Sequence, residues 1–159
     1  MIDFCKSFNK KFYQISTISV SGNSLETFSE EQNVKEETVF KENNLYVGQS
    51  LENVYVRSKF EAECLVLDAI LEDNLDCYIL RMGNLMPRFR DGVFQENISK
   101  NAFINRLIAF VKIGAIPDYI QDNYLEFTPI DIASNSIITL MSHPSQKNRV
   151  FHLYNHNHV

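Results

Sequence analysis

The segment YVRSK, residues 55–59, places a phenol and an ammonium group four residues apart near the start of an apolar-periodic stretch. On a helix, residues with this spacing lie one above the other on the same face. An ammonium group favours the ionised form of a neighbouring phenol, so Tyr55 and Lys59 could together transfer a proton. Chance alone gives about 0.4 Y-x-x-x-K matches in a chain with this many tyrosines and lysines. The pair therefore needs support from other parts of the chain.

The segments around this pair predict an α/β protein with a parallel sheet. KFYQISTISVSG (residues 11–22) is rich in aromatic and β-branched residues, which predicts a buried strand that ends in hydroxyl side chains. Periodic apolar residues predict a long helix over residues 51–71, and DCYILRMGNL (residues 76–85) contains a short apolar strand. Strand, helix and strand in this order predict a βαβ unit. The strand ending at Thr17 should then lie parallel and next to the strand ending at Arg81, with the helix across both.

The rest of the chain predicts three further helices and one more strand. The helices are expected over residues 1–8, 101–113 and 130–141, and the strand is expected at VFHLYN (residues 150–155). Residues 23–50 are polar and acidic without sustained periodicity, which is typical of a lid or a disordered connection.

Ligands of open parallel sheets bind beyond the carboxyl ends of the strands. We therefore expect three features to converge on one cleft. They are the hydroxyl residues Ser16, Thr17 and Ser19, the Gly83-Asn84 turn and the helix that carries Tyr55.

Composition limits the class of protein. A length of 159 residues with 45% hydrophobic residues suits one domain with a core, and a formal charge of −5 with a pI of about 5.3 argues against a nucleic-acid surface. Residues 81–112 carry six basic and two acidic side chains, which could meet an acidic or phosphate-bearing partner. A solvated surface is the simpler interpretation of this segment.

The cysteines and histidines do not predict a metal site. Cys5, Cys64 and Cys77 are odd in number and form no C-x-x-C, which argues against a zinc site or disulfide framework, and Cys64 is expected to be a buried, inert thiol. The histidines near the chain end, including HNH at 156–158, offer no reliably convergent ligands. No apolar run reaches about 18 residues and no secretory h-region is present. We expect a soluble cytoplasmic protein that neither spans a membrane nor binds nucleic acid.

Four motifs in a fixed order resemble the extended short-chain dehydrogenase/reductase family: ISTISVSG, a long loop, YVRSK and ILRMGNLMPR. More narrowly, RDGVFQENISKNAFINRLIAFVKIGAIPD followed by LEFTPIDIASNSI looks like the terminal thioester reductase domains of nonribosomal peptide synthetases and carboxylic acid reductases. The resemblance covers nearly the whole chain. It implies the C-terminal part of a Rossmann-like, doubly wound parallel sheet and part of the small substrate-binding region.

The resemblance also implies roles for individual residues. Thr17 matches the hydroxyl residue that hydrogen-bonds the substrate carbonyl oxygen, and Tyr55 matches the tyrosine that supplies a proton as hydride arrives. Lys59 matches the lysine that holds the nicotinamide ribose and assists the tyrosine. Tyr55 and Lys59 thus also belong to the cofactor site. The nicotinamide end of that site is completed by the turn Met82, Gly83, Asn84 and Leu85.

One departure from the family pattern concerns the pyrophosphate site. Nucleotide-binding units of this kind need a glycine-rich turn after their first strand. The chain has five glycines, and no G-x-x-G-x-x-G can be built from them. We therefore expect a single partial reductase domain over residues 1–159 that lacks the N-terminal, glycine-rich half. Residues 1–85 form its Rossmann-like part with the catalytic motif, and residues 86–159 hold the substrate-side helices and the last strand.

The implied activity is that of a fragment of an NADPH-dependent thioester reductase. Such an enzyme releases an acyl or peptidyl thioester from a phosphopantetheine-bearing carrier protein as an aldehyde, which a second reduction can convert to an alcohol. One alternative is an extended short-chain reductase that acts on acyl-CoA or a nucleotide sugar. Another is a truncated fragment that has no activity unless a partner supplies the missing half. The isolated chain is expected to be inactive, to bind NADPH weakly and to expose a sheet edge.

Overall fold

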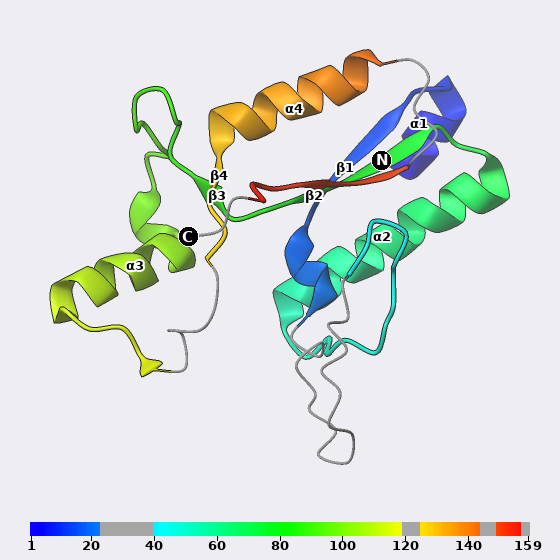
Figure 1. Cartoon of the computed structure of the whole chain (residues 1–159). Coiled ribbons are helices and arrows are strands. Elements are labelled where there is room, and N and C mark those ends of the chain that lie inside the picture. The colour runs from blue at the N-terminus through cyan, green and yellow to red at the C-terminus, as the bar shows by residue number, and fades with distance from the viewer. Residues whose placement is uncertain (23–39, 119–124, 144–148, 157–159) are drawn as a thin grey trace. The chain divides into compact units, whose positions relative to one another are not determined.

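The computed structural model describes residues 1–22, 40–118, 125–143 and 149–156 (Figure 1). The elements follow one another as α1 (Ile2–Phe8), β1 (Phe12–Thr17), the 3-10 helix η1 (Ile18–Ser21), α2 (Val54–Asp73), β2 (Cys77–Met82), β3 (Leu85–Met86), the 3-10 helix η3 (Ile98–Lys100), α3 (Ala102–Ile113), β4 (Thr128–Pro129), α4 (Ile130–Ser142) and β5 (Val150–Leu153).

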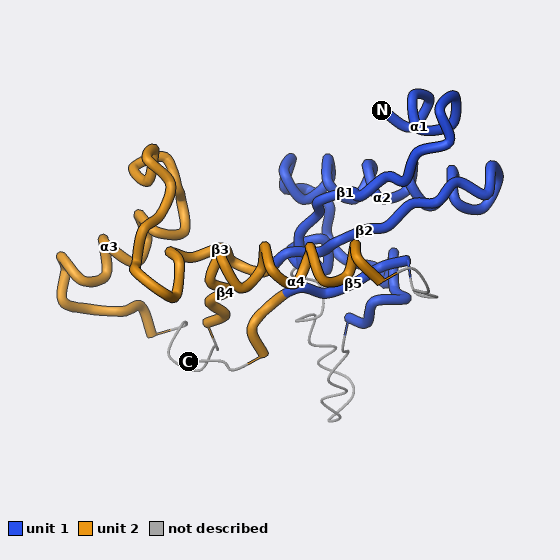
Figure 2. Tube along the Cα trace, turned by 90° about the horizontal axis from the view of Figure 1, so that it is seen from above, with its two compact units in different colours: residues 1–82, 144–153 blue, residues 83–143, 154–159 orange. Residues whose placement is uncertain are grey.

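The chain divides into two compact units, which Figure 2 shows in different colours. Unit 1 comprises Met1–Met82 and Pro144–Leu153, and unit 2 comprises Gly83–His143 and Tyr154–Val159. The last strand, which the sequence groups with residues 86–159, belongs to the sheet of unit 1 because it pairs with β2.

Unit 1 is built on a parallel sheet with the strand order β1-β2-β5. Phe12 lies opposite Cys77 and Thr17 lies opposite Met82, so the predicted parallel pairing of these two strands is confirmed. Helix α2 packs against both β1 and β2, as predicted. Within the described residues β1 pairs with β2 alone, and the side chain of Ile15 on this edge strand is 45% exposed.

Helix α2 carries the segment with Tyr55 and Lys59. The sequence predicts it over residues 51–71, and it begins at Val54 because the side chain of Asn53 accepts hydrogen bonds from the amides of Tyr55 and Val56, at 2.9 and 3.2 Å. It ends at Asn74, which adopts a left-handed conformation. The helix buries one face against the sheet, at Val56, Glu63, Val66 and Ala69.

The first strand ends where the sequence predicts, although the apolar run itself continues to residue 22. It stops at Thr17, and the next four residues form η1. The physical reason is local, since the Thr17 hydroxyl oxygen accepts a hydrogen bond from the amide of Ser19 at 3.2 Å and so caps the turn. The chain therefore turns immediately after Thr17.

The core of unit 1 lies between α1, α2 and the central strand. Its buried members are Cys5, Val66, Ala69, Leu75, Cys77 and Ile79. Strand β2 is buried along its whole length, as expected for a central parallel strand that is covered on both faces.

A charged cluster joins the starts of the three strands of unit 1. Lys11, Asp76 and Arg149 each immediately precede a strand, and Asp76 accepts a hydrogen bond from Arg149 and pairs with Lys11 at 3.3 Å. Burial alone would raise the pKa of Asp76, but the hydrogen bonds from Arg149 and Lys11 outweigh it and lower the pKa. The Arg149 guanidinium also lies 4.9 Å from the ring centre of Tyr78.

Unit 2 contains α3, α4 and the short parallel pair β3-β4. The predicted helices at 101–113 and 130–141 are confirmed to within one residue at each end. The amides of Phe89 and Arg90 donate to the carboxylate of Asp131, at 2.9 and 3.4 Å, and the bond from Phe89 is the main reason why the pKa of Asp131 is lowered. These bonds fix the segment after β3 to the first turn of α4.

We predict that Leu80→Ala lowers the free energy of unfolding by about 2–5 kcal/mol, because it leaves a cavity in a packed core. Leu80 is 1% exposed in β2. The matched control is Leu71→Ala, since Leu71 is 81% exposed on α2, and it should change stability by less than about 0.5 kcal/mol. Urea denaturation measures both. Equal effects of the two substitutions would contradict the central position of β2.

Candidate active site

Tyr55 and Lys59 lie on the first turns of α2. The side chain of Tyr55 is 54% exposed, and the Lys59 ammonium nitrogen lies 6.0 Å from the centre of its ring. The neighbourhood that helical spacing predicts is therefore present. An exposed phenol beside an ammonium group is available to a ligand, and the ammonium can stabilise negative charge on or near the phenol oxygen.

Lys59 also connects the helix to the first strand. Its ammonium nitrogen donates a hydrogen bond to the carbonyl oxygen of Ile15 at 3.1 Å. Ile15 precedes Thr17 by two residues in β1, and α2 packs against η1, which follows Thr17. The fold thus brings Lys59 to the strand end that carries the predicted hydroxyl residue.

Thr17 is 7% exposed at the end of β1. Its hydroxyl donates to the hydroxyl oxygen of Ser19 at 3.1 Å, so these two predicted hydroxyl residues lie together. The side chain of Ser16 is directed elsewhere, because its hydroxyl donates to Glu63 Oε1 at 2.5 Å in the interior. Of the hydroxyl groups named from the sequence, Thr17 and Ser19 form a pair, and Ser16 has a separate, buried contact.

The turn at residues 82–85 crosses from unit 1 to unit 2. Met82 ends β2 and is buried. At Gly83 a Cβ atom would lie 2.5 Å from Glu126 Oε2 and 2.6 Å from Thr128 Oγ1, so this position has no room for a side chain. The amide of Asn84 donates to Glu126 Oε2 at 2.6 Å. Glu126, which was not singled out from the sequence, therefore fixes the backbone of the turn in unit 2.

A buried ion pair between Glu63 and Arg81 was not predicted from the sequence. Both residues are 0% exposed. Arg81 Nε donates to both carboxylate oxygens of Glu63 at 3.1 Å, and Arg81 Nη2 donates to Oε2 at 2.8 Å. Arg81 was counted in the basic segment 81–112 that could form a surface, and for this residue that interpretation is wrong. The arginine inside the apolar strand CYILRM could have predicted such a pair, because a buried charge requires a partner.

Arg81 also contacts residues 40–44, which belong to the long connection between η1 and α2. Its Nη2 donates to the carbonyl oxygen of Asn44 at 2.8 Å, and the ring of Phe40 lies 4.8 Å from its guanidinium carbon. Gln49, which is 2% exposed, donates to the carbonyl oxygen of Val20 at 3.0 Å. Residues 40–49 are therefore attached to unit 1. The lid or disorder predicted for residues 23–50 falls mainly on 23–39, which lie outside the described residues.

His152 is a partly buried residue of β5 next to this ion pair. Arg81 Nη1 lies 3.2 Å from its Nε2, and the backbone amide of His152 donates to Glu42 Oε1 at 2.7 Å. Burial is the main reason why the pKa of His152 is lowered, and the Arg81 guanidinium lowers it further against the opposing effect of Glu42 and Glu63. A neutral imidazole at this position can accept a hydrogen bond from Arg81.

Cys64 and the histidines near the chain end are the other candidate groups noted from the sequence. Cys64 is partly exposed, so the prediction that it is buried is wrong. Desolvation nevertheless raises the pKa of its thiol, which is expected of an inert cysteine. No group of three or more His, Cys, Asp or Glu side chains that could hold a metal occurs among the described residues, and His158 lies outside them. Within the same parts of the chain, no helix is long and apolar enough to cross a membrane.

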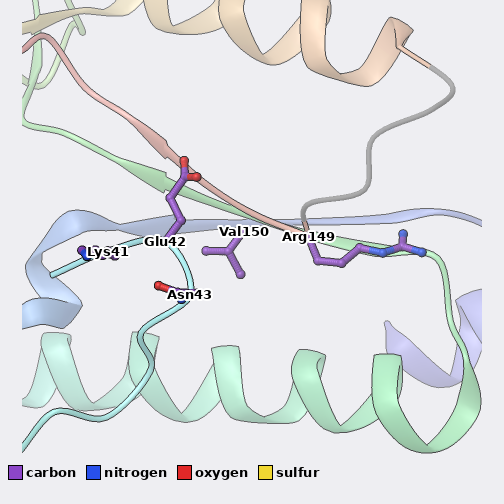
Figure 3. A pocket seen from close by; sticks show the side chains of 5 residues that line it. All are labelled: Lys41, Glu42, Asn43, Arg149 and Val150. Carbon is purple, nitrogen blue, oxygen red and sulfur yellow. The ribbon is translucent and has the colours of Figure 1, made fainter.

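A cavity of about 340 Å³ lies between the loop at residues 41–43 and the start of β5 in unit 1 (Figure 3). It is lined by Lys41, Glu42, Asn43, Arg149 and Val150. The side chains of Lys41 and Arg149 lie at opposite ends of this group and point away from each other (Figure 3). Arg149 is also bound to Asp76. The two cations therefore do not converge on a ligand, and neither Tyr55 nor Lys59 lines the cavity.

We predict that His152 makes the folded chain less stable below about pH 6.5. Because its pKa is lowered in the folded state, the unfolded chain takes up a proton first as the pH falls. Between pH 7.5 and 5.5 the loss should be at most about 1 kcal/mol, since His152 is partly exposed. Urea denaturation at both pH values should show a smaller loss for His152→Gln than for the wild type. The control His143→Gln, at an exposed position, should behave as the wild type, and an unchanged pH dependence in His152→Gln would refute the assignment.

Comparisons with known proteins identify the family. Residues 1–137 match the NAD-binding family described as Male sterility protein. A search of curated proteins finds no match. Among solved structures, a thiolation-reductase di-domain from an archaeal non-ribosomal peptide synthetase is 38% identical with a TM-score of 0.81, and the alignment covers 99% of this chain and 41% of that chain. The Aureusimine biosynthetic cluster reductase domain is 27% identical with a TM-score of 0.81, over 99% of this chain and 40% of that one.

A third match concerns the fold alone. The dTDP-glucose 4,6-dehydratase from Bacillus anthracis in complex with NAD is 16% identical with a TM-score of 0.64, over 99% of this chain and 45% of that one.

The chain spans about two-fifths of the length of the first two structures that it matches. The predicted Rossmann-like class and the likeness to extended short-chain reductases of the thioester reductase type are confirmed. The chain belongs to the NAD-binding family described as Male sterility protein.

Proposed function

We propose that this chain is the catalytic and substrate-side part of an NADPH-dependent reductase that acts on carrier-bound thioesters. The observation that carries the proposal is the position of the Lys59 ammonium, which lies 6.0 Å from the ring centre of Tyr55 and 3.1 Å from the carbonyl oxygen of Ile15 near Thr17. The comparisons support it, because the chain is 38% identical to part of a reductase that is joined to a thiolation domain.

The residues suit one end of a nicotinamide cofactor. Tyr55 and Lys59 present a phenol and an ammonium group at the beginning of α2, where they could hydrogen-bond the hydroxyls of a ribose. The Met82 to Leu85 turn would border the nicotinamide. The chain has no glycine-rich turn for the pyrophosphate. NADPH would therefore be held at its nicotinamide end by this chain and at its pyrophosphate by a separate nucleotide-binding segment.

The cofactor, when bound, supplies a hydride to the carbonyl carbon of the thioester. Tyr55 would place a hydroxyl donor at the carbonyl oxygen, where negative charge develops as the hydride arrives. Thr17 would place a second donor there once its O–H turns away from the Ser19 oxygen. Tyr55 would transfer its proton to that oxygen, and Lys59 would stabilise the resulting phenolate. The hydroxyl group of the resulting hemithioacetal then loses its proton as the C=O bond forms and the carbon–sulfur bond breaks. The leaving sulfur takes up a proton and departs as the thiol of the carrier arm, and the acyl group is released as an aldehyde.

The proposed substrate is an acyl or peptidyl group on the phosphopantetheine arm of a carrier protein. The thiolation domain in the archaeal di-domain structure supports this choice. The alternative of a nucleotide-sugar substrate rests on similarity of fold, since the dehydratase match is only 16% identical. The alternative of an acyl-CoA substrate keeps the same thioester but needs no carrier protein. Comparing turnover of a carrier-bound thioester with turnover of the same acyl group on CoA and of a nucleotide sugar separates these classes of substrate.

We predict distinct kinetic effects for the three proposed catalytic residues in a complete reductase domain that contains this chain. Tyr55→Phe should lower kcat strongly and leave NADPH affinity nearly unchanged, because only a transition-state hydrogen bond is lost. Lys59→Ala should damage both properties. Thr17→Val, which is nearly isosteric, should lower kcat about 10- to 1000-fold.

Steady-state kinetics and NADPH titration measure these effects. Tyr46→Phe is a suitable control, because Tyr46 is a similarly exposed tyrosine, 64% exposed, outside the proposed site. It should retain wild-type kinetics. Wild-type turnover by the Tyr55→Phe enzyme would mean that YVRSK is only the start of a helix.

We also predict that the 159-residue chain alone binds NADPH much more weakly than a micromolar ligand, because it has no glycine-rich pyrophosphate turn. Isothermal titration calorimetry of the chain, with a complete reductase domain as the positive control, tests this. A dissociation constant near 1 μM, about 8 kcal/mol of binding free energy, would contradict the proposed division of the cofactor site.

A further inference from the structure

We infer that the buried pair of Glu63 and Arg81 is a positioning device for the proposed catalytic residues. We call it, together with Ser16, the buried clamp. The inference depends on the proposed reductase function for its kinetic consequences, but the structural coupling can be tested without it. None of the three residues is expected to touch the substrate or NADPH.

The clamp connects the helix of the proposed site to two strand ends. Glu63 lies on α2, eight residues after Tyr55 and four after Lys59. Glu63 Oε1 accepts from Ser16 Oγ at 2.5 Å, and Glu63 Oε2 accepts from Arg81 Nη2 at 2.8 Å. The carboxylate therefore bonds to β1 and β2 at once.

The residues that it holds are neighbours of the proposed reactive residues. Ser16 directly precedes Thr17, and Arg81 directly precedes Met82. Ser16 and Arg81 are themselves opposite each other in the parallel register. Since Lys59 donates to the carbonyl oxygen of Ile15, next to Ser16, two successive turns of α2 are attached to the same short length of β1.

Arg81 extends the clamp to the far side of β2. Its Nη2 also donates to the carbonyl oxygen of Asn44 at 2.8 Å, and its Nη1 lies 3.2 Å from His152 Nε2. A planar guanidinium offers five donors in a fixed geometry, which a lysine ammonium cannot reproduce. One side chain thereby ties α2, β2, β5 and the loop at residues 40–49 together.

The energetics favour a positional function over a purely stabilising one. Replacing a buried ion pair by apolar residues of similar volume is often neutral or stabilising, because desolvation of the charges offsets their attraction. The hydrogen bonds of such a pair do fix the distance between the two side chains and their relative orientation. A displacement of about 1 Å at a reacting group can cost about 100-fold in rate. The clamp would thus affect kcat more than it affects stability.

The test uses the paired substitution Glu63→Leu with Arg81→Met, which removes both charges and leaves no unpaired buried ion. A second variant, Ser16→Ala, removes only the bond to β1. The matched control is Asp73→Asn, which deletes another carboxylate of α2 that pairs with Lys6 at 2.5 Å on the surface, at the opposite end of the helix from Tyr55.

The first measurement is amide hydrogen exchange of the 159-residue chain. If the clamp positions α2, exchange at residues 56–60 should become at least about 10-fold faster in the paired variant and measurably faster in Ser16→Ala. The Asp73→Asn chain should match the wild type in this segment. Wild-type exchange at residues 56–60 in both clamp variants would overturn the proposal, and if the paired variant does not fold, Ser16→Ala alone decides.

The second measurement is kinetic and uses a complete reductase domain that contains the chain. We expect kcat to fall about 10- to 100-fold in the paired variant and about 3- to 10-fold in Ser16→Ala. The solvent deuterium isotope effect on kcat should rise, because a poorly aligned Tyr55 slows proton transfer, whereas a mere loss of stability would leave it unchanged. Folded variants with wild-type kcat and isotope effect would refute the positioning function. If the wild-type domain itself reduces no thioester, the proposed function fails, and the exchange experiment still decides whether the clamp exists.

Discussion

The burial of the Arg81 guanidinium in the central strand is the constraint on which the arrangement of unit 1 depends. Taking a charge out of water costs several kcal/mol unless a counter-charge and hydrogen bonds accompany it. Glu63 meets this requirement, with both residues fully buried. The helix must therefore present Glu63 to the sheet, which fixes its rotation about its own axis. The same rotation also turns Lys59, which lies one turn before Glu63, towards β1, where it bonds to the carbonyl oxygen of Ile15.

Local patterns predict most of the fold because the elements of unit 1 follow simple periodicities. The apolar strand at 77–82 and the helix that precedes it were both predictable, and so was their parallel arrangement with the first strand. The predicted end of β1 at Thr17 is also correct, but its physical cause is a side-chain hydrogen bond to Ser19 and not a change in hydrophobicity. The two-residue strands β3 and β4 are too short to produce a periodic pattern.

The candidate site divides in the same way into local and long-range parts. Spacing within one helix predicted that Tyr55 and Lys59 are neighbours. Contacts between residues far apart in the chain had no comparable signal, and Glu126, which fixes the turn at Gly83 and Asn84, is an example. The ion pair of Arg81 was partly predictable. An arginine within an apolar strand indicates that a carboxylate partner exists, but it does not indicate which residue supplies that carboxylate.

The two ends of the parallel sheet carry different kinds of side chains. Lys11, Asp76 and Arg149 bind one another where the strands begin, and Thr17 and Met82 lie where the strands end. Selection for a new substrate can therefore alter loops at the second end without disturbing the ionic contacts at the first. A protein engineer would hold the starting ends and the buried clamp constant and diversify the loops that follow the finishing ends. The polarity of a parallel sheet thus separates an ionic cluster that joins the strand starts from the loops beyond the strand ends, where new specificity can arise.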